Sequence, residues 1–248
     1  MNPADALVDE NLRLGELLAT ADPEVSVPTC PGWTLRQLLT HVGRGDRWAA
    51  MIVRDRAQER VDIRAVPEGK PSADDPVGWL AGSARLLVDA VAATGPDVPV
   101  WTFTGPKPAV WWIRRRLHEA TVHRADASIA LGVPFAIEPA LAADAVSEWL
   151  DVLAARPAPE AGPALADGAT LHLHATDDGL GTDGEWLVRS ADGRLAWEHG
   201  HGKGAVAVRG RAADILQAVT RRIPADDPRL QVLGDETVWR TWLERTPF

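Results

Sequence analysis

The sequence has no tyrosine and a single cysteine, Cys30, so no disulfide can form within the chain. Lysine occurs at only three positions, and the net charge is −9. This acidic balance argues against nucleic acid or an anionic membrane as a partner, because both select for a basic surface. No apolar run approaches the ~20 residues that a membrane span needs. The first residues lack the features of a signal peptide, so we expect a cytoplasmic protein.

The composition is otherwise that of an ordinary globular protein. Hydrophobic residues make up 46% and charged residues 25% of the 248 positions, which is enough for one large domain or two small ones. Tryptophan is abundant, with 11 residues. Because an indole is apolar but carries one N–H donor, these residues suit both a core and an apolar pocket with a few polar points.

Hydrophobic spacing divides the chain into two parts. The first part has the period of helices, which we expect at about 5–20, 34–57, 76–94, 111–131 and 140–154. Thr34 and Gln37 are placed to form a capping box, and Gly132 occupies the position after a helix C-terminus. A proline-rich and glycine-rich segment without periodicity follows, which indicates a linker.

Beyond the linker the period changes from 3.6 to 2. Strands are expected at 171–176, 185–189, 195–198, 205–209 and 230–233, and helices at 212–222 and 236–244. Asp-Gly pairs mark tight turns between several of the strands. The sequence therefore predicts an α+β protein. A helical domain spans residues 1–158, and a small domain with an antiparallel sheet spans residues 159–248.

The segment 111–126 predicts one uninterrupted helix, because it contains no glycine or proline. Glu119 and His123 are four residues apart and so project from one face, one turn apart. A carboxylate and an imidazole in this arrangement can share a divalent metal if a third ligand comes from elsewhere. Asp126, three residues further on, could accept the second N–H of the His123 imidazole.

Two neighbours on this helix bear on the metal interpretation. His118 precedes His123 by five residues, or about 140° around the helix, so the two cannot face one ion. Arg116 could pair with Glu119, which would make the carboxylate part of a surface ion-pair stripe of little energetic value. From the residues alone, both the metal and the ion-pair interpretations stay open.

The third ligand could come from the helix at 34–57. His41 lies on the flank of its apolar stripe, close to Gly45, whose missing side chain leaves room beside the imidazole. Such a histidine can face a cleft between helices. Taken alone, the simpler interpretation is a partly buried histidine that bonds a neighbouring carboxylate.

Other residues with chemical potential have structural interpretations. His172 and His174 alternate along a strand and share a face, so they could hold a second metal, but exposed strand histidines are the simpler interpretation. Cys30 is followed by proline and glycine, which favours a structural turn over a nucleophile.

Two motifs resemble those of a known family. The first runs Val-Pro-Thr-Cys-Pro-Gly-Trp-Thr-Leu-Arg-Gln-Leu-Leu-Thr-His-Val-Gly-Arg at 27–44, and the second includes Trp112, Arg115, His118, Glu119, Val122, His123, Arg124, Asp126 and Ala127. Both look like the motifs of the mycothiol-dependent maleylpyruvate isomerase family. The similarity continues through the C-terminal part, so it covers almost the whole chain.

The resemblance implies a DinB-like four-helix bundle followed by a small domain similar to sterol carrier protein 2. It implies a divalent metal, usually zinc, held at the positions of His41, Glu119 and His123. It also implies a catalytic arginine from the C-terminal domain, for which Arg222 is the best match and the adjacent Arg221 an alternative. Equally, a cation there could serve only to stabilise the end of a helix.

The resemblance also implies the chemistry. Three protein ligands leave one coordination position open, as in catalytic zinc sites, and a thiol there would be held as thiolate. In the family, the thiolate of the cofactor mycothiol adds to the cis double bond of maleylpyruvate. The bond rotates, and elimination gives fumarylpyruvate. Arg222, Arg114 or Arg115 would hold the substrate carboxylates by a bidentate contact.

Two other functions stay open. A mycothiol S-transferase would keep the same ligands but join the thiol to an electrophile or a natural-product intermediate. A non-catalytic metal- or ligand-binding protein would use the apolar pocket and close its metal site with a fourth protein ligand. The expected partners are a small-molecule substrate and a small thiol, and the expected assembly is a monomer or a small homo-oligomer.

Overall fold

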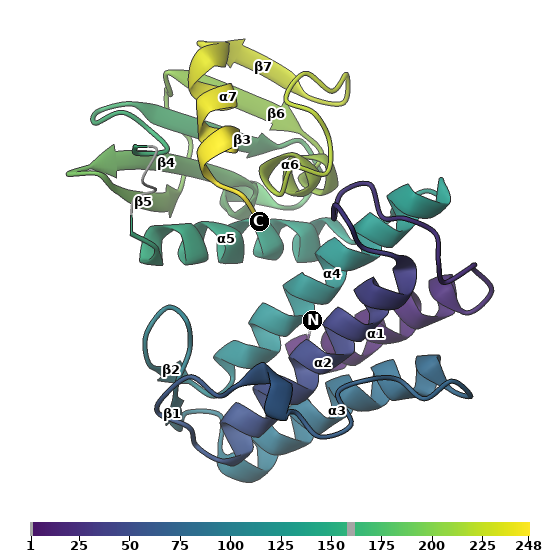
Figure 1. Cartoon of the computed structure of the whole chain (residues 1–248). Coiled ribbons are helices and arrows are strands. Elements are labelled where there is room, and N and C mark those ends of the chain that lie inside the picture. Colours follow the sequence, from purple (N-terminus) through teal and green to yellow (C-terminus); the bar gives the residue numbers. More distant parts are fainter. Residues whose placement is uncertain (1, 158–161) are drawn as a thin grey trace. The chain divides into compact units, whose positions relative to one another are not determined.

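Four helices form the N-terminal unit of the structure, a computed structural model that describes residues 2–157 and 162–248 (Figure 1). They are α1 (Pro3–Leu18), α2 (Leu35–Arg54), α3 (Pro76–Thr94) and α4 (Trp111–Leu131). Helix α2 packs along α3, and α1 packs against α3 and α4. The connections contain the 3₁₀ turn η1 (Ile63–Ala65) and a ribbon of β1 (Pro99–Val100) and β2 (Lys107–Pro108). The predicted four-helix bundle is confirmed.

Local signals in the sequence set the ends of these helices. The capping box of α2 is present: the Thr34 N–H donates to Gln37 Oε1 at 2.8 Å, and the Gln37 N–H donates to Thr34 Oγ1 at 3.5 Å. Gly132 ends α4 in the left-handed conformation, with φ at 65°. That conformation is strained for residues with a side chain, so the glycine fixes where α4 stops.

The apolar core of the bundle joins all four helices. Leu14 from α1, Leu38 and Val42 from α2, Leu80 from α3 and Ala120 from α4 are buried in one cluster. These residues belong to the stripes of helical period, so burial of apolar surface determines which face of each helix points inward.

Helix α4 is buried on nearly every side, although much of it is charged. Its buried polar residues include Arg115, Arg116, His118, His123, Arg124 and Asp126. Buried charges are tolerated only with close partners. The Arg124 guanidinium donates to both carboxylate oxygens of Glu10 on α1, at 2.8 and 3.2 Å, and Arg116 Nε donates to Asp46 on α2 at 2.8 Å. These pairs fix the rotation of α4 against α1 and α2.

Helix α3 is the one described helix long and apolar enough, by length and composition, to cross a membrane. The expectation that no apolar run reaches this length therefore does not hold for α3. A core helix of a globular protein passes the same test of length and composition. Here α3 packs against α1 and α2 and buries Leu80 and Leu87.

The C-terminal unit is built on a five-stranded sheet (Figure 1). Its elements are α5 (Pro139–Ala155), β3 (Thr170–Ala175), η2 (Gly181–Gly184), β4 (Glu185–Ala191), β5 (Arg194–His199), β6 (Val206–Gly210), α6 (Ala212–Val219), β7 (Gln231–Gly234) and α7 (Glu236–Arg245). The strand order is β5-β4-β3-β6-β7. The α+β fold class predicted from the sequence is confirmed.

The sheet is mixed rather than purely antiparallel, which corrects the prediction. Strands β3, β4 and β5 form an antiparallel meander, but β6 returns to the far side of β3 and pairs with it in parallel, with Leu173 opposite Val208. Strand β7 then pairs antiparallel with β6. Alternating hydrophobicity shows that a strand has one buried face, but it does not determine which strands become neighbours or their relative direction.

The boundary between the two units lies after Phe135, whereas the sequence predicted it between residues 158 and 159. Helix α5 accounts for the difference, because it packs against α6 and β5. In addition, the Trp186 indole on β4 donates to Ser147 Oγ on α5 at 2.8 Å. The proline-rich segment after α5, part of which lies outside the described residues, therefore connects α5 to the sheet of the same unit. The composition of this segment predicts a loop. It does not show whether the helix before the loop belongs to the first or the second unit.

Candidate metal centre

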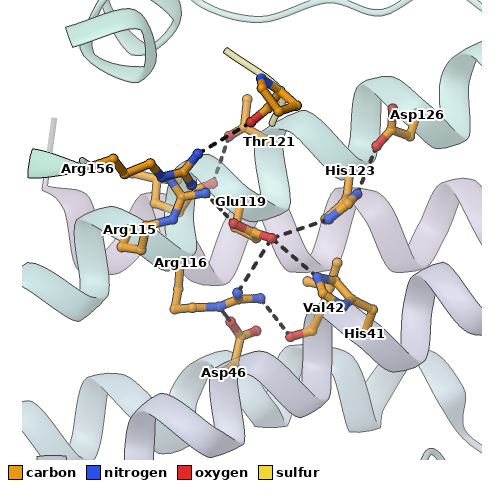
Figure 2. Close-up of polar contacts among 12 residues, drawn as sticks. His41, Val42, Asp46, Arg115, Arg116, Glu119, Thr121, His123, Asp126 and Arg156 are labelled. Atoms are coloured by element: carbon orange, nitrogen blue, oxygen red, sulfur yellow. Dashed lines mark hydrogen bonds and ion pairs between the residues drawn. The ribbon is translucent and has the colours of Figure 1, made fainter. Parts of the chain in front are cut away.

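Three predicted ligands come together between two helices of the N-terminal unit. His41 projects from α2, and Glu119 and His123 project from α4 (Figure 2). Glu119 Oε1 lies 3.2 Å from His41 Nε2 and 3.4 Å from His123 Nε2. The candidate ligand atoms of all three residues lie within 4.8 Å of one another. The fold thus brings the third ligand to the pair already adjacent on one helix face.

The donor chemistry fits a divalent transition metal. Two imidazole nitrogens and one carboxylate oxygen are the ligand set of several catalytic zinc sites. Among the residues that the structure describes, no further His, Cys, Asp or Glu offers an atom within 4.8 Å of all three. A metal held by His41, Glu119 and His123 would therefore keep a coordination position for a non-protein ligand.

Asp126 orients the His123 imidazole, as the sequence predicted. Its Oδ2 lies 2.8 Å from His123 Nδ1, which leaves Nε2 directed at Glu119 (Figure 2). Asp126 is itself held, because the Thr29 hydroxyl donates to Oδ1 at 2.5 Å and the Cys30 thiol donates to Oδ2 at 3.4 Å. Such outer partners fix the tautomer and orientation of a metal-binding histidine.

An aromatic ring lies against both imidazoles. The Trp33 ring centroid is 4.7 Å from that of His41 and 6.0 Å from that of His123. The two imidazoles are 4.9 Å apart in an edge-to-face arrangement. Trp33 belongs to the turn that also carries Thr29 and Cys30, so one short segment before α2 contributes an apolar wall and the support of Asp126.

Two consecutive arginines of α4, Arg115 and Arg116, pair with different carboxylates. Arg115, one turn before Glu119, pairs with Glu119 Oε2. Arg116 is bound mainly to Asp46, and its Nη1 remains 4.0 Å from Glu119 Oε1. The predicted Arg116–Glu119 pair is thus secondary to Arg115–Glu119, because the i,i+4 spacing gives Arg115 the closer approach.

Gly45 makes room for Arg116 rather than for His41, contrary to the sequence-based interpretation. A Cβ at position 45 would approach the Arg116 guanidinium to 2.6 Å. The missing side chain therefore lets Arg116 reach Asp46 Oδ1 and the Val42 carbonyl, to which Arg116 Nη2 donates at 3.0 Å. A larger residue at position 45 would displace the guanidinium that ties α4 to α2.

These contacts determine the protonation of the centre. Burial acts to raise the pKa of Glu119, but the charge of Arg115 and the hydrogen bonds with His123 and His41 outweigh it and hold the pKa well below its ordinary value. Burial lowers the pKa of His41. Burial also acts to lower the pKa of His123, but hydrogen bonds with Asp126, Cys30 and Glu119 outweigh it and raise this pKa to about 10. The metal-free centre therefore holds a carboxylate beside an imidazolium.

Comparison with known proteins agrees with this geometry. The description "Mycothiol maleylpyruvate isomerase N-terminal domain" matches residues 4–128, and "MDMPI C-terminal domain" matches residues 140–241. The chain belongs to the mycothiol-dependent maleylpyruvate isomerase family. The family resemblance inferred from the two sequence motifs is confirmed.

Solved structures show the same fold. A crystal structure of the mycothiol-dependent maleylpyruvate isomerase in a histidine-to-alanine mutant form aligns with a TM-score of 0.59 at 15% identity, covering 93% of this chain and 91% of that one. The crystal structure without that mutation aligns with a TM-score of 0.53 at 14% identity and the same coverage. A search of curated protein sequences finds no match.

His41, Glu119 and His123 form a trio of candidate ligands. His118 and Cys30 lie in the two motifs that resemble the isomerase family, but neither belongs to this trio. His118 is 1% exposed on α4 and is not among the residues whose ligand atoms converge with Glu119 and His123, as the helical angle predicted. Cys30 donates its thiol proton to Asp126, which is a supporting role. The sequence indicated a turn at Cys30, but not that the turn reaches α4.

The predicted catalytic arginine lies in the C-terminal unit. Helix α6 ends at Val219, so Arg221 and Arg222 follow the helix rather than form its last turn as predicted. Arg221 adopts a positive φ of 64°. Arg222 Nη1 donates to the Thr220 carbonyl at 2.5 Å, and its guanidinium lies 4.6 Å from the Phe248 ring centroid. A catalytic role for Arg222, with Arg221 as the alternative, stays a prediction.

A cavity of about 810 Å³ adjoins the centre in the N-terminal unit. Trp33 and His41 belong to its lining, together with three basic residues, Arg36, Arg44 and Lys70. None of the described residues that line it is acidic, although the whole chain is acidic. Arg44 is not among the residues predicted for the site, but its position three residues after His41 places it on the same face of α2.

We expect His41→Ala or His123→Ala to reduce the metal content by one equivalent per chain, since each removes one of three ligands. The measurement is elemental analysis of metal-loaded, desalted protein, with circular dichroism to verify folding. His118→Gln is the matched control, because it changes a histidine of the same motif outside the trio, and it should leave the metal content unchanged. An unchanged metal content in His123→Ala would contradict the assignment.

Metal affinity should increase with pH up to about 10, because the metal must displace the proton of His123. The stability of the metal-free protein should change in the opposite sense. The contribution of His123 to the free energy of unfolding is complete below its unfolded pKa of 6.5 and is lost as the pH rises towards 10.

Asp126→Asn tests this linkage. Without the carboxylate the pKa of His123 falls, so fewer protons should be released per metal bound near neutral pH, and the affinity should fall by about 10- to 100-fold. Calorimetry in buffers of different ionisation enthalpy measures both quantities. Asp9→Asn, an exposed position on α1, is the control. Equal proton release in the wild type and Asp126→Asn would contradict the role of Asp126.

Proposed function

We propose that the protein is a metal-dependent, mycothiol-dependent cis–trans isomerase of the maleylpyruvate isomerase type. The observation that carries the proposal is a three-ligand centre, with no fourth protein ligand among the described residues, beside a cavity lined by basic side chains. A closed, four-ligand centre would instead have favoured the purely structural or binding role. Membership of the family supports mycothiol as the thiol partner.

His41, Glu119 and His123 would hold the metal, with zinc the ion that this donor set favours. The bound ion would lower the pKa of a thiol so that it is present as thiolate at neutral pH. The chain prepares the ligands for this: Arg115 keeps Glu119 ionised, and Asp126 keeps His123 Nε2 directed at the centre. The Trp33 ring lies against the two imidazoles and would cover part of their surface.

The isomerisation balances without any other reactant. Beside the centre of His41, Glu119 and His123, mycothiol would supply a thiolate that adds reversibly to one carbon of the cis double bond. The displaced electron pair would move to the conjugated carbonyl, and the bond, now single, would rotate. Return of the electron pair would restore the double bond in the trans geometry and release the same thiolate.

The basic lining of the cavity suits a dicarboxylate substrate. Arg44 lines the cavity, and its Nε makes no hydrogen bond with any described residue. Lys70 adds a second cation from the loop before α3. Cations placed here would bind carboxylates and stabilise the negative charge that develops on the enolate. Arg222, from the C-terminal unit, remains the proposed catalytic arginine.

The size of the cavity favours one alternative. A volume of about 810 Å³ falls in the range of pockets for drug-sized ligands and exceeds the needs of maleylpyruvate alone. Mycothiol would fill part of this space, but a bulkier electrophile would also fit. A mycothiol S-transferase therefore remains the second candidate, and its thioether product would distinguish it from the isomerase.

The test is to incubate zinc-loaded protein with mycothiol and maleylpyruvate and to follow both components by chromatography. We expect conversion of the cis to the trans acid, with mycothiol recovered in full and no reaction in His123→Ala. Consumption of mycothiol with formation of a thioether would support the transferase instead. The absence of turnover with maleylpyruvate and with a generic electrophile would contradict both enzymatic functions.

Arg44→Gln should raise the KM for the dicarboxylate by at least about 10-fold with a smaller change in kcat, because a charge-assisted hydrogen bond contributes about 1.5–3 kcal/mol. Arg54→Gln is the control, since Arg54 lies on the same helix, is exposed and pairs with Asp55. Equal KM values for Arg44→Gln and the wild type would remove Arg44 from substrate binding.

A further inference from the structure

A second group of metal-ligating side chains lies in the C-terminal unit. His172 and His174 come from β3, Glu185 begins β4, and His201 lies in the segment between β5 and β6. Their candidate ligand atoms all lie within 4.8 Å of one another. None of them belongs to the centre in the N-terminal unit.

The strand register explains how three of these residues meet. Leu171 and Leu173 on β3 are fully buried, so His172 and His174 share the opposite face. Glu185 is directly opposite His174 in the antiparallel pair of β3 and β4. Two histidines and one carboxylate are therefore placed on one face by the sheet itself.

The segment between β5 and β6 delivers the fourth residue. Its backbone bonds to both neighbouring strands: the Gly200 N–H donates to the Glu185 carbonyl at 3.2 Å, and the Ala205 N–H donates to the Thr170 carbonyl at 2.8 Å. A Cβ at Gly204 would lie 3.1 Å from the His172 backbone nitrogen, so glycine permits this close approach. The loop lies against the sheet and brings His201 over the two strand histidines.

The three imidazoles converge on one carboxylate oxygen. Glu185 Oε2 lies 2.9 Å from His172 Nε2, 2.7 Å from His201 Nδ1 and 3.7 Å from His174 Nδ1. The imidazole centroids are 5.1 to 6.1 Å apart. Without a metal, three imidazoles crowd around one acceptor oxygen. A divalent cation would instead be bound by one atom from each of the four side chains.

We propose that His172, His174, Glu185 and His201 form a second metal site that binds zinc. Three nitrogens and one carboxylate oxygen suit zinc and other borderline first-row cations, whereas calcium and magnesium prefer oxygen ligands. Four protein ligands are typical of a closed, structural zinc site. The bound metal ties the segment between β5 and β6 to β3 and β4, so it stabilises one face of the sheet.

The test uses untagged protein that is stripped with a chelator, reloaded with zinc, desalted and analysed for metal. We expect two equivalents of zinc per chain in the wild type, one in His41→Ala/His123→Ala, one in His172→Ala/His201→Ala, and none when the four substitutions are combined. The loss on changing His172 and His201 is one equivalent whether or not the N-terminal centre binds metal. The result for the second site is therefore independent of the result for the proposed function.

His201→Ala is the most informative single variant, because the His201 side chain is 76% exposed and its removal leaves the packing intact. In the His41→Ala/His123→Ala background, cobalt should give the visible absorption of a tetrahedral site. His201→Ala should abolish that absorption and the rise in Tm on adding zinc. His199→Ala is the control: its imidazole bonds the Glu185 carbonyl outside the group, so both signals should persist.

Two results would overturn the proposal. One is equal zinc content in the wild type and in His172→Ala/His201→Ala. The other is zinc retained in full by both His201→Ala and Glu185→Gln in the background without the N-terminal centre, which would place the metal elsewhere.

Discussion

The partly buried carboxylate of Glu119 is the group on which the N-terminal unit depends. It sits between two imidazoles and an arginine, and the same helix binds α1 through Arg124 and α2 through Arg116. A buried carboxylate is stable only when opposite charge and hydrogen bonds surround it. The contacts that pack α4 against α2 therefore adjoin those of the candidate metal ligands, since Arg116 bonds Asp46 and also lies near Glu119.

The structure also contrasts two ways of arranging histidines for a metal. In the N-terminal unit, helix spacing supplies two ligands, tertiary packing supplies the third, and a cavity lies beside the group. In the C-terminal unit, strand alternation supplies two histidines, the register supplies a carboxylate, and a loop adds another histidine. The first arrangement leaves room for a small molecule, whereas the second surrounds its centre with protein ligands. On the two proposals above, the three-ligand centre would serve catalysis and the four-ligand centre would serve stability.

Sequence reasoning was strongest where periodicity is local. The four helices, the cap at Thr34 and the pairing of Glu119 with His123 follow from spacing alone. Spacing does not reveal which partner a long side chain chooses, so the sequence assigned Gly45 to His41 rather than to Arg116. It also could not bring Glu185 and His201 to the strand histidines, because strand register and the course of a loop are tertiary properties.

The separation of the metal ligands along the chain has a consequence for folding kinetics. His41 and Glu119 are 78 residues apart, so the chain between them, which includes all of α3, must close as a loop before His41, Glu119 and His123 can meet. Closing such a span has an entropic cost that local helix formation does not bear. Uptake of a metal at this centre would therefore report the docking of α2 against α4 and not the formation of either helix alone.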